Sequence, residues 1–270
     1  GISLTNWTVS RPSITRFVGL KNYITMFQDD DILLAFKNTA IFTVAIVILR
    51  NLFAILLALA LVKKLYTRTY LRTIFYIPAV LSYVVVGIMF TAMFQMNGTF
   101  NQILNAFGIP CTKEWLASGD TALLMVIVED VWKWTGFHMI IYIAGLQAIP
   151  TDLYEAAKID GANKWQTLWK VTIPNVMPSI TICMFLTLTN GFKLFDQNLA
   201  LTGGQPYIIN PDGTSVHTTE MLALNIYNTF YGQNTNARGT AQAKAVLFFI
   251  LVAAIGLIQL NATRKKEVQQ

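Results

Sequence analysis

Five long runs of apolar residues dominate the chain, and polar connections separate them. Each run has about the 20 predominantly apolar residues that a helix needs to cross the hydrocarbon core of a bilayer. Each is expected to be helical, because backbone groups in lipid must find their hydrogen bonds within the segment. The sequence therefore predicts an all-α, polytopic transmembrane helical bundle. Its five spanning helices are expected at residues 38–62, 73–96, 121–146, 176–194 and 241–260.

Lysine and arginine residues are distributed unevenly among the connections. They gather after the first, third and fifth apolar runs, at residues 63–72, 147–174 and 263–270. The connections at 97–120 and 195–240 hold one basic residue each. Because basic residues accumulate on the cytoplasmic side of a membrane, all the connections agree on one orientation with a cytoplasmic C-terminus.

This orientation places residues 1–37 outside the membrane, as an extracytoplasmic or interfacial segment. An odd number of spans then leads us to expect a further spanning helix ahead of Gly1. The transmembrane domain is expected at 38–262 and a short cytoplasmic tail at 263–270.

Composition agrees with a membrane protein. The chain is 54% hydrophobic and 13% charged, whereas soluble domains carry roughly 25% charged residues. The net charge of +6 would also suit a nucleic-acid partner, but the basic residues lie beside apolar runs, which favours lipid and no nucleic acid. The two cysteines, Cys111 and Cys183, are too few for a metal quartet, and we expect neither a disulfide nor a metal site.

The connection at residues 147–174 has the most informative pattern in the chain. Asp152 and Glu155 have the spacing of a helix N-cap and its reciprocal partner, which predicts a short helix at 153–160. Gly161 follows where the end of a helix often needs a left-handed residue.

A second short helix is predicted after this glycine, with Trp165 and Trp169 on the face that braces the first helix and Pro174 at its end. Two such helices would make a compact projection suited to a groove on a partner protein. An interfacial loop whose tryptophans lie among lipid headgroups would show the same pattern. The residue pattern alone leaves both interpretations open.

The same connection resembles the characteristic cytoplasmic loop of permease subunits in bacterial importers of the ATP-binding-cassette superfamily. The matching residues are Glu155-Ala156-Ala157, Ile159-Asp160-Gly161-Ala162 and Ile173-Pro174. The preceding Ala144-Gly145-Leu146-Gln147-Ala148-Ile149-Pro150 is similar to maltose-type sugar permeases, and Leu201-Thr202-Gly203-Gly204-Gln205-Pro206 to the larger of their two permeases. The resemblance covers essentially the whole chain, although the stretch from Tyr207 to His217 looks like an insertion.

The resemblance implies a type I importer permease, a multi-pass protein of the bacterial cytoplasmic (inner) membrane. Its implied partners are a second homologous permease, two ATP-binding-cassette ATPase subunits, an external solute-binding protein and a sugar, in particular an oligosaccharide. The residues implied to couple to the ATPase are Glu155, Ala156, Ala157, Asp160, Gly161, Trp165 and Pro174.

The chain has no Gly-x-x-x-x-Gly-Lys-Ser/Thr phosphate loop. It is therefore not expected to be an enzyme or to hold a cofactor, and ATP and Mg²⁺ would bind to the partner ATPase subunits.

Charged residues deep inside the predicted spans are informative, because charge there is costly and usually has a partner or a function. Arg50 lies near the middle of the first apolar run, and Glu129, Asp130 and Lys133 lie in the outer half of the third. We expect Arg50 to pair with Glu129 or Asp130. A local Glu129–Lys133 pair at i, i+4 is the alternative.

Aromatic rings mixed with polar groups mark a candidate substrate path, because sugars offer flat C–H faces and many hydroxyl groups. An interfacial aromatic belt would place the same residue types at the same depths. Pro78 is expected to interrupt the second span, and His138 to be a hydrogen-bonded packing residue. The candidate path residues are Tyr83, Trp134, Phe137, Asn190, Phe192 and Asp196.

The rival interpretation is a self-sufficient secondary transporter or channel for a polar solute. Such a protein would need ion-coupling carboxylates near the midplane and often contains an internal repeat, whereas this sequence shows no repeat and its acidic residues are off-centre in one run. A membrane enzyme is disfavoured, because only His138 and His217 are available for a metal-spaced or catalytic set.

Overall fold

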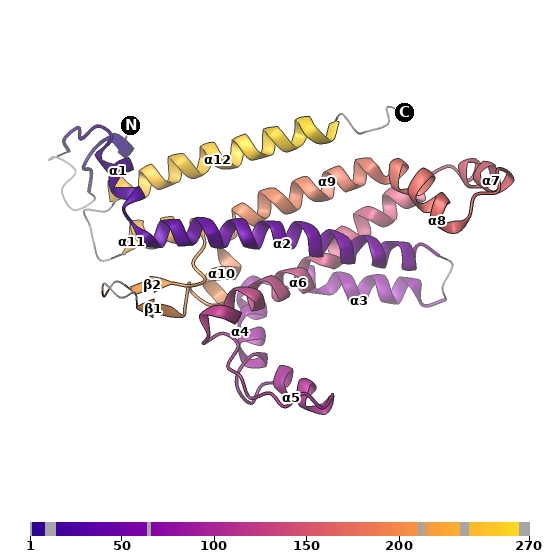
Figure 1. The fold of residues 1–270 in the computed structure, drawn as a ribbon, viewed down its shortest axis with the longest axis horizontal. Helices are drawn as coiled ribbons and strands as arrows, with labels where there is room; N and C mark the ends of the chain where they lie inside the picture. Colours follow the sequence, from indigo (N-terminus) through magenta and orange to yellow (C-terminus); the bar gives the residue numbers. More distant parts are fainter. Residues whose placement is uncertain are drawn as a thin grey trace. The chain divides into compact units, whose positions relative to one another are not determined.

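The computed structural model describes residues 2–8, 15–63, 66–209, 213, 215–232 and 238–264. These parts are helical apart from connections and one β-hairpin (Figure 1), so the predicted all-α fold class is confirmed. The chain folds into two compact units. Unit 1 consists of Gly1–Thr43, Ser82–Glu129 and Asn190–Ala254, and unit 2 of Val44–Leu81, Asp130–Thr189 and Ile255–Gln270.

Four long helices contribute residues to both units: α2 (Asp30–Leu61), α6 (Gly119–Gln147), α9 (Ile173–Phe192) and α12 (Arg238–Arg264). The other elements of unit 1 are η1 (Ile2–Leu4), α1 (Lys21–Phe27), α4 (Tyr83–Met93), α5 (Thr99–Ala106), α10 (Asp196–Leu201), β1 (Tyr207–Ile209), β2 (Ser215–His217) and α11 (Leu222–Tyr231). Unit 2 also holds α3 (Arg68–Val80), α7 (Thr151–Ile159), α8 (Lys164–Thr167), the π-helical turn η3 (Leu168–Thr172) and most of α9.

Helices occupy all five ranges predicted to span the membrane, but these helices differ in length, continuity and apolar character. Among the described residues, three helical stretches are long and apolar enough to cross a bilayer, and the broken pair α3 and α4 would make a fourth. The three stretches are Asp30–Leu61, Lys164–Phe192 and Arg238–Gln259. The remaining predicted span is α6, a helix of 29 residues with charged side chains in its middle.

The second predicted span is not one helix, and its break lies later than the proline pattern predicts. Pro78 stays inside α3, which ends at Val80. Leu81 and Ser82 then adopt extended backbone, with ψ of 144° and 149°. The side chain of Ser82 accepts a hydrogen bond from the Val85 N–H at 3.3 Å and so begins α4 as an N-cap.

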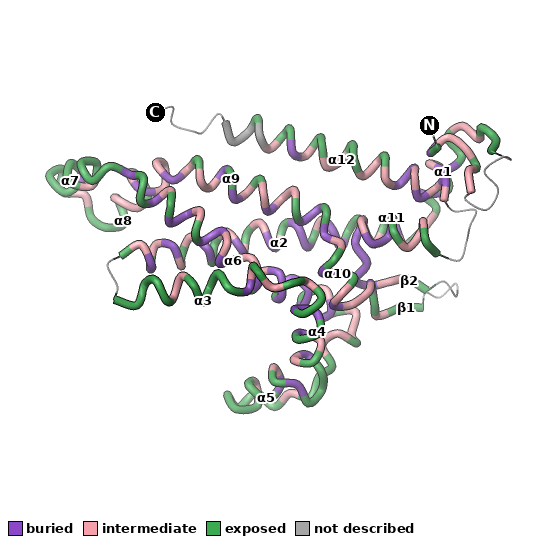
Figure 2. Tube along the Cα trace, turned by 180° about the vertical axis from the view of Figure 1, so that it is seen from behind, coloured by how far each residue is buried: buried purple, intermediate pink, exposed green. Residues whose placement is uncertain are grey.

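The apolar core of unit 2 is built by α2, α6 and α9, with Ala54, Met139 and Cys183 fully buried. Away from this core, large apolar side chains such as Ile48 and Ile182 are exposed (Figure 2). Exposed apolar surface on long helices is what a lipid environment allows, because lipid tails are as apolar as the side chains.

In unit 1, the segment from Tyr207 to His217 forms an antiparallel β-hairpin in which these two residues are opposite each other. Residues 210–212 and 214 of this predicted insertion lie outside the described residues. The Asn38 side chain of α2 donates hydrogen bonds to the carbonyl oxygens of Thr218 and Glu220 at 2.8 and 3.1 Å. These bonds attach the end of the hairpin to α2.

Candidate functional site

The predicted coupling segment folds as two short helices, α7 and α8, which lie together at the end of α9 (Figure 1). Helix α7 begins at Thr151, its N-cap position is Pro150, and no side chain caps it. The predicted N-cap pair of Asp152 and Glu155 is therefore wrong, because the helix starts earlier than the pattern indicated. Asp152 lies in the first turn instead, where the helix dipole favours a carboxylate.

Gly161 has the left-handed backbone that the sequence predicts, with φ of +75°. The N–H of Ala162 donates to the carbonyl oxygen of Ala157 at 2.9 Å, and the N–H of Gly161 donates to that of Lys158 at 3.2 Å. These two bonds form a Schellman motif that ends α7. A Cβ at position 161 would have no atom within 4 Å, so the need for glycine comes from the backbone conformation.

Helix α8 begins with a capping box that the sequence analysis missed. The Asn163 side chain accepts from the N–H of Gln166 at 2.8 Å, and the Gln166 side chain accepts from the N–H of Asn163 at 2.9 Å. The spacing of an Asn followed three residues later by a Gln is itself a signal of this motif.

Pro174 does not end the second helix, contrary to the prediction. The chain continues from α8 through the π-helical turn into α9, where Pro174 lies in the first turn. The Ile173 N–H donates to the carbonyl oxygen of Leu168, five residues back. Proline lacks the N–H that a regular α-helical turn requires. The wider π-helical turn just before Pro174 accommodates this residue without breaking the helix.

The two tryptophans predicted to brace α7 are largely exposed. Their ring centroids lie 5.8 Å apart, so they contact each other, and Trp165 and Trp169 are 67% and 55% exposed. A hydrogen bond of 3.4 Å from the Thr172 hydroxyl to the Tyr154 hydroxyl joins the π-helical turn η3 to α7.

The predicted coupling residues are not all presented to a partner in the same way. Glu155, Ala156, Asp160 and Gly161 are exposed, Pro174 is half-buried, and Ala157 is buried at 8% exposure. The surface of this projection therefore consists of an acidic first helix, the turn at Gly161 and the tryptophan pair.

The charged residues of unit 2 that the sequence places inside predicted spans are buried, with Arg50 in α2 and Asp130 and Lys133 in α6. Arg50 forms an ion pair with Asp130, and each side chain is 2% exposed, which confirms one of the two partners expected for Arg50. Lys133 donates to the carbonyl oxygen of Pro78 at 3.1 Å and also to that of Leu81. The lysine therefore adds donors at the end of α3, where the Pro78 carbonyl oxygen also accepts from the Leu81 N–H at 3.3 Å.

A second polar network in unit 2 was not predicted. The Tyr142 hydroxyl donates to the Asn51 side chain at 2.7 Å, and Asn51 donates to the Thr187 hydroxyl at 3.4 Å. Thr187 also hydrogen-bonds to the Nε2 of His138 at 3.0 Å. His138 is therefore a hydrogen-bonded packing residue, as expected. The sequence signal for this network was the presence of two polar residues, Asn51 and Thr187, within apolar runs.

The candidate path residues belong to both units. In unit 2, the Trp134 and Phe137 rings are in edge-on contact at 5.8 Å, and both side chains are half-buried. In unit 1, Tyr83 is half-buried and Phe192 is buried. The two polar candidates of unit 1, Asn190 and Asp196, are exposed and open to a ligand or a partner.

Comparisons with known proteins agree on one family. Residues 50–267 match the family described as binding-protein-dependent transport system inner membrane component. The chain is 38% identical to the "probable starch degradation products transport system permease protein AmyD" of Thermoanaerobacterium thermosulfurigenes, over 99% of this chain and 86% of that protein. It is 33% identical to the multiple sugar-binding transport system permease protein MsmF of Streptococcus mutans, over 98% of this chain and 87% of that protein.

The fold is also found in a solved structure. A chain of the bacterial alginate ABC transporter, crystallised in complex with an alginate pentasaccharide-bound periplasmic protein, is similar with a TM-score of 0.78. The two are 24% identical, and the match covers 92% of this chain and 83% of that chain. With its helical fold, its buried charges and these relatives, the chain belongs to the family of inner membrane components of binding-protein-dependent transport systems.

Proposed function

We propose that this chain forms part of the solute path in an ATP-driven importer of sugars, and of oligosaccharides in particular. The chain is a non-catalytic membrane subunit of its family. Relatives named for starch degradation products and for multiple sugars support a carbohydrate substrate. The complete importer would add a second homologous permease, two ATPase subunits that bind ATP and Mg²⁺, and an external solute-binding protein.

The observation that carries this proposal is the projection formed by α7, Gly161 and α8. It combines an exposed carboxylate at Glu155, a turn fixed by two backbone hydrogen bonds, and an exposed tryptophan pair. Aromatic side chains surrounded by polar groups are typical of protein interfaces. Closure of the ATPase subunits would move this projection and so open the path to the external side.

The helical stretch that runs from α8 into α9 would transmit this movement into the membrane-spanning part of the chain. The stretch Lys164–Phe192 has no break between the projection and the position of Asn190. A displacement of α8 would therefore be transmitted along α9. We propose that Asn190, Phe192 and Asp196 contact the sugar on its way through, together with Tyr83, Trp134 and Phe137.

Substitution of Gly161 tests the coupling role. Gly161→Val should strain the left-handed position by about 1 kcal/mol or more, tilt α7 against α8, and lower co-purification of the ATPase and sugar uptake. Gly161→Asn should retain both, because asparagine tolerates this backbone better than other side chains. Glu155→Ala should also weaken docking, because a cationic group on the ATPase would lose its partner.

The matched control is Gly108→Val. Gly108 also has a left-handed backbone, with φ of +79°, and a Cβ there would likewise meet no atom within 4 Å. It lies after α5 and away from the projection in sequence, so it should leave ATPase co-purification intact. Normal ATPase yield and normal transport in both Gly161→Val and Glu155→Ala would refute the coupling role.

A further inference from the structure

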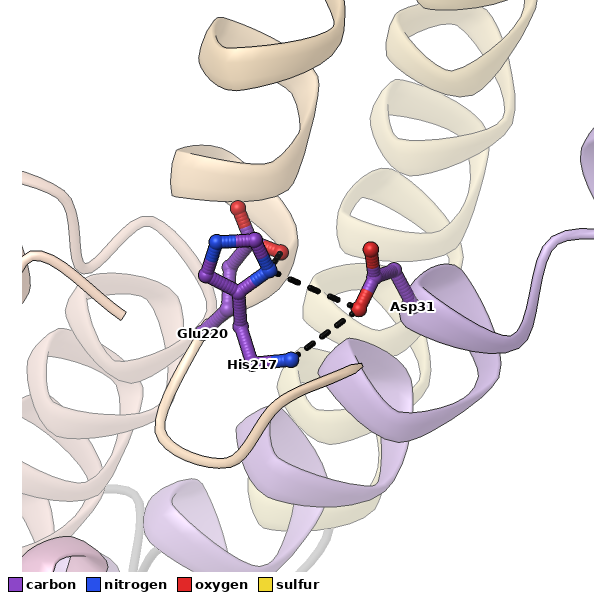
Figure 3. Close-up of side chains that lie close together, drawn as sticks. All are labelled: Asp31, His217 and Glu220. Atoms are coloured by element: carbon purple, nitrogen blue, oxygen red, sulfur yellow. Dashed lines mark hydrogen bonds and ion pairs between the residues drawn. The ribbon is translucent and has the colours of Figure 1, made fainter. Parts of the chain in front are cut away.

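Three side chains of unit 1 that are far apart in the sequence lie together in one polar cluster (Figure 3). Asp31 is in the first turn of α2, His217 ends β2, and Glu220 lies two residues before α11. One potential ligand atom from each, namely a ring nitrogen and two carboxylate oxygens, lies within 4.8 Å of the other two. Sequence spacing gave no signal of this set, because 186 positions separate Asp31 from His217.

The distances inside the cluster are those of a metal site rather than of hydrogen bonds. The Nδ1 of His217 lies 3.6 Å from the Oδ1 of Asp31 and 3.7 Å from the Oε2 of Glu220. Tetrahedral zinc, with bonds of about 2.0–2.2 Å, holds its ligand atoms roughly 3.3–3.5 Å apart. The two distances from the His217 Nδ1 are therefore close to those between ligand atoms that share one ion.

The Nδ1 of His217 faces the two carboxyl groups without a hydrogen-bond partner among the described residues. This nitrogen is shielded from solvent. The ring is held by the Tyr207 ring, at 4.6 Å between centroids. Buried polar atoms in native proteins are nearly always partnered, so an orphan nitrogen that faces two carboxylates points to a missing ligand.

The two carboxylates are already oriented by second contacts. The backbone N–H of His217 donates to the Oδ1 of Asp31 at 3.1 Å. The amide groups of Asn225 and Asn228 donate to the two oxygens of Glu220 at 3.1 and 2.5 Å. Outer contacts of this kind orient metal ligands and raise affinity.

The charge balance also favours a cation. Glu220 is buried at 1% exposure, and the cluster brings two carboxyl groups together with one imidazole. The neighbouring Lys244 does not supply the compensating charge, because it is itself paired with Asp29 at 2.8 Å.

We propose that Asp31, His217 and Glu220 form a binding site for a divalent transition-metal ion, with zinc as the best fit. Zinc binds both imidazole nitrogen and carboxylate oxygen, and a water molecule as fourth ligand would complete a tetrahedral site. The ion would tie together the start of α2, the end of the hairpin and the start of α11. The loop charges put this segment on the external side of the membrane, and the site does not depend on the proposed sugar transport.

Metal titration of the assembled importer tests the site. The complex is purified in lipid nanodiscs with an affinity tag that contains no histidine, and is titrated with Zn²⁺ against a chromophoric chelator. Wild type should bind one more equivalent of Zn²⁺ than His217→Ala. Glu220→Gln and Asp31→Asn should each lower the affinity by at least about tenfold, as losses around metal ligands do.

Asp30→Asn is the matched control, because Asp30 is an exposed carboxylate in the same helical turn and should leave Zn²⁺ binding unchanged. Visible absorption of bound Co²⁺, present in wild type and lost in His217→Ala, gives a second readout at the ligand itself. If His217→Ala fails to fold, Glu220→Gln keeps the shape of the side chain and carries the test. No Zn²⁺ binding by wild type, or equal binding by wild type and the folded ligand variants, would overturn the proposal.

Discussion

At the scale of residues, the buried ion pair of Arg50 and Asp130 is expected to matter strongly to the stability of unit 2. Asp130→Ala should lower the free energy of unfolding by about 3–5 kcal/mol, because it leaves the guanidinium group buried without its carboxylate. The effect is measured as a lower unfolding midpoint of the complex in mild detergent.

Two further variants separate the lost ion pair from a general loss of charge. Asp120→Ala removes an exposed carboxylate from the first turn of the same helix and should cost much less. The double variant Arg50→Met with Asp130→Leu should recover most of the stability, since apolar residues of similar volume often replace a buried ion pair without loss. An Asp130→Ala variant as stable as wild type would show that the pair contributes little.

At the scale of elements, the packing of α6 against α3 depends on the absence of a side chain at Gly136. A Cβ there would lie 1.8 Å from the carbonyl oxygen of Phe75, and backbone cannot move aside as a flexible side chain can. Gly136→Ala should therefore force the two helices apart and destabilise unit 2 by about 1–3 kcal/mol. Thermal unfolding and the yield of folded complex measure this effect.

Gly256→Ala provides the comparison within α12. Its Cβ would meet its nearest neighbour, a Phe185 ring atom, at an ordinary 3.8 Å. Alanine is favoured over glycine in a helix by about 1 kcal/mol, so this variant should be neutral or slightly stabilising. Equal tolerance of both alanines would mean that α3 and α6 do not pack as closely as the structure has them.

At the scale of the whole molecule, the two native cysteines report on orientation. Cys111 is half-buried in the connection before α6, whereas Cys183 is fully buried. In right-side-out vesicles, a membrane-impermeant maleimide should label Cys111 but not Cys183. A cysteine introduced at Ile159, a position that is 85% exposed in α7, should react only after permeabilisation. Labelling of Ile159→Cys in sealed vesicles would reverse the predicted orientation.

The sequence by itself determined the features whose causes are local. Apolar runs of about 20 residues predicted where the long helices lie, because backbone hydrogen bonding and hydrophobicity act along a single segment. The left-handed turn at Gly161 was predicted for the same reason, since it depends on the conformation of one residue and two neighbouring carbonyl groups. The choice of an acidic partner for Arg50 followed from the cost of an isolated charge at membrane depth.

The tertiary structure decided whatever depends on contacts between distant segments. The sequence predicted a helix break at Pro78 and a helix end at Pro174, whereas the helix breaks after Val80 and continues through Pro174. A proline leaves its neighbours several ways to satisfy the freed backbone groups. The two tryptophan rings contact each other, a detail that helical spacing alone does not predict. Asp31, His217 and Glu220 meet only because the hairpin and the start of α11 fold back onto α2. Metal-ligand geometry of this kind arises from long-range packing, and no pattern along the chain encodes it.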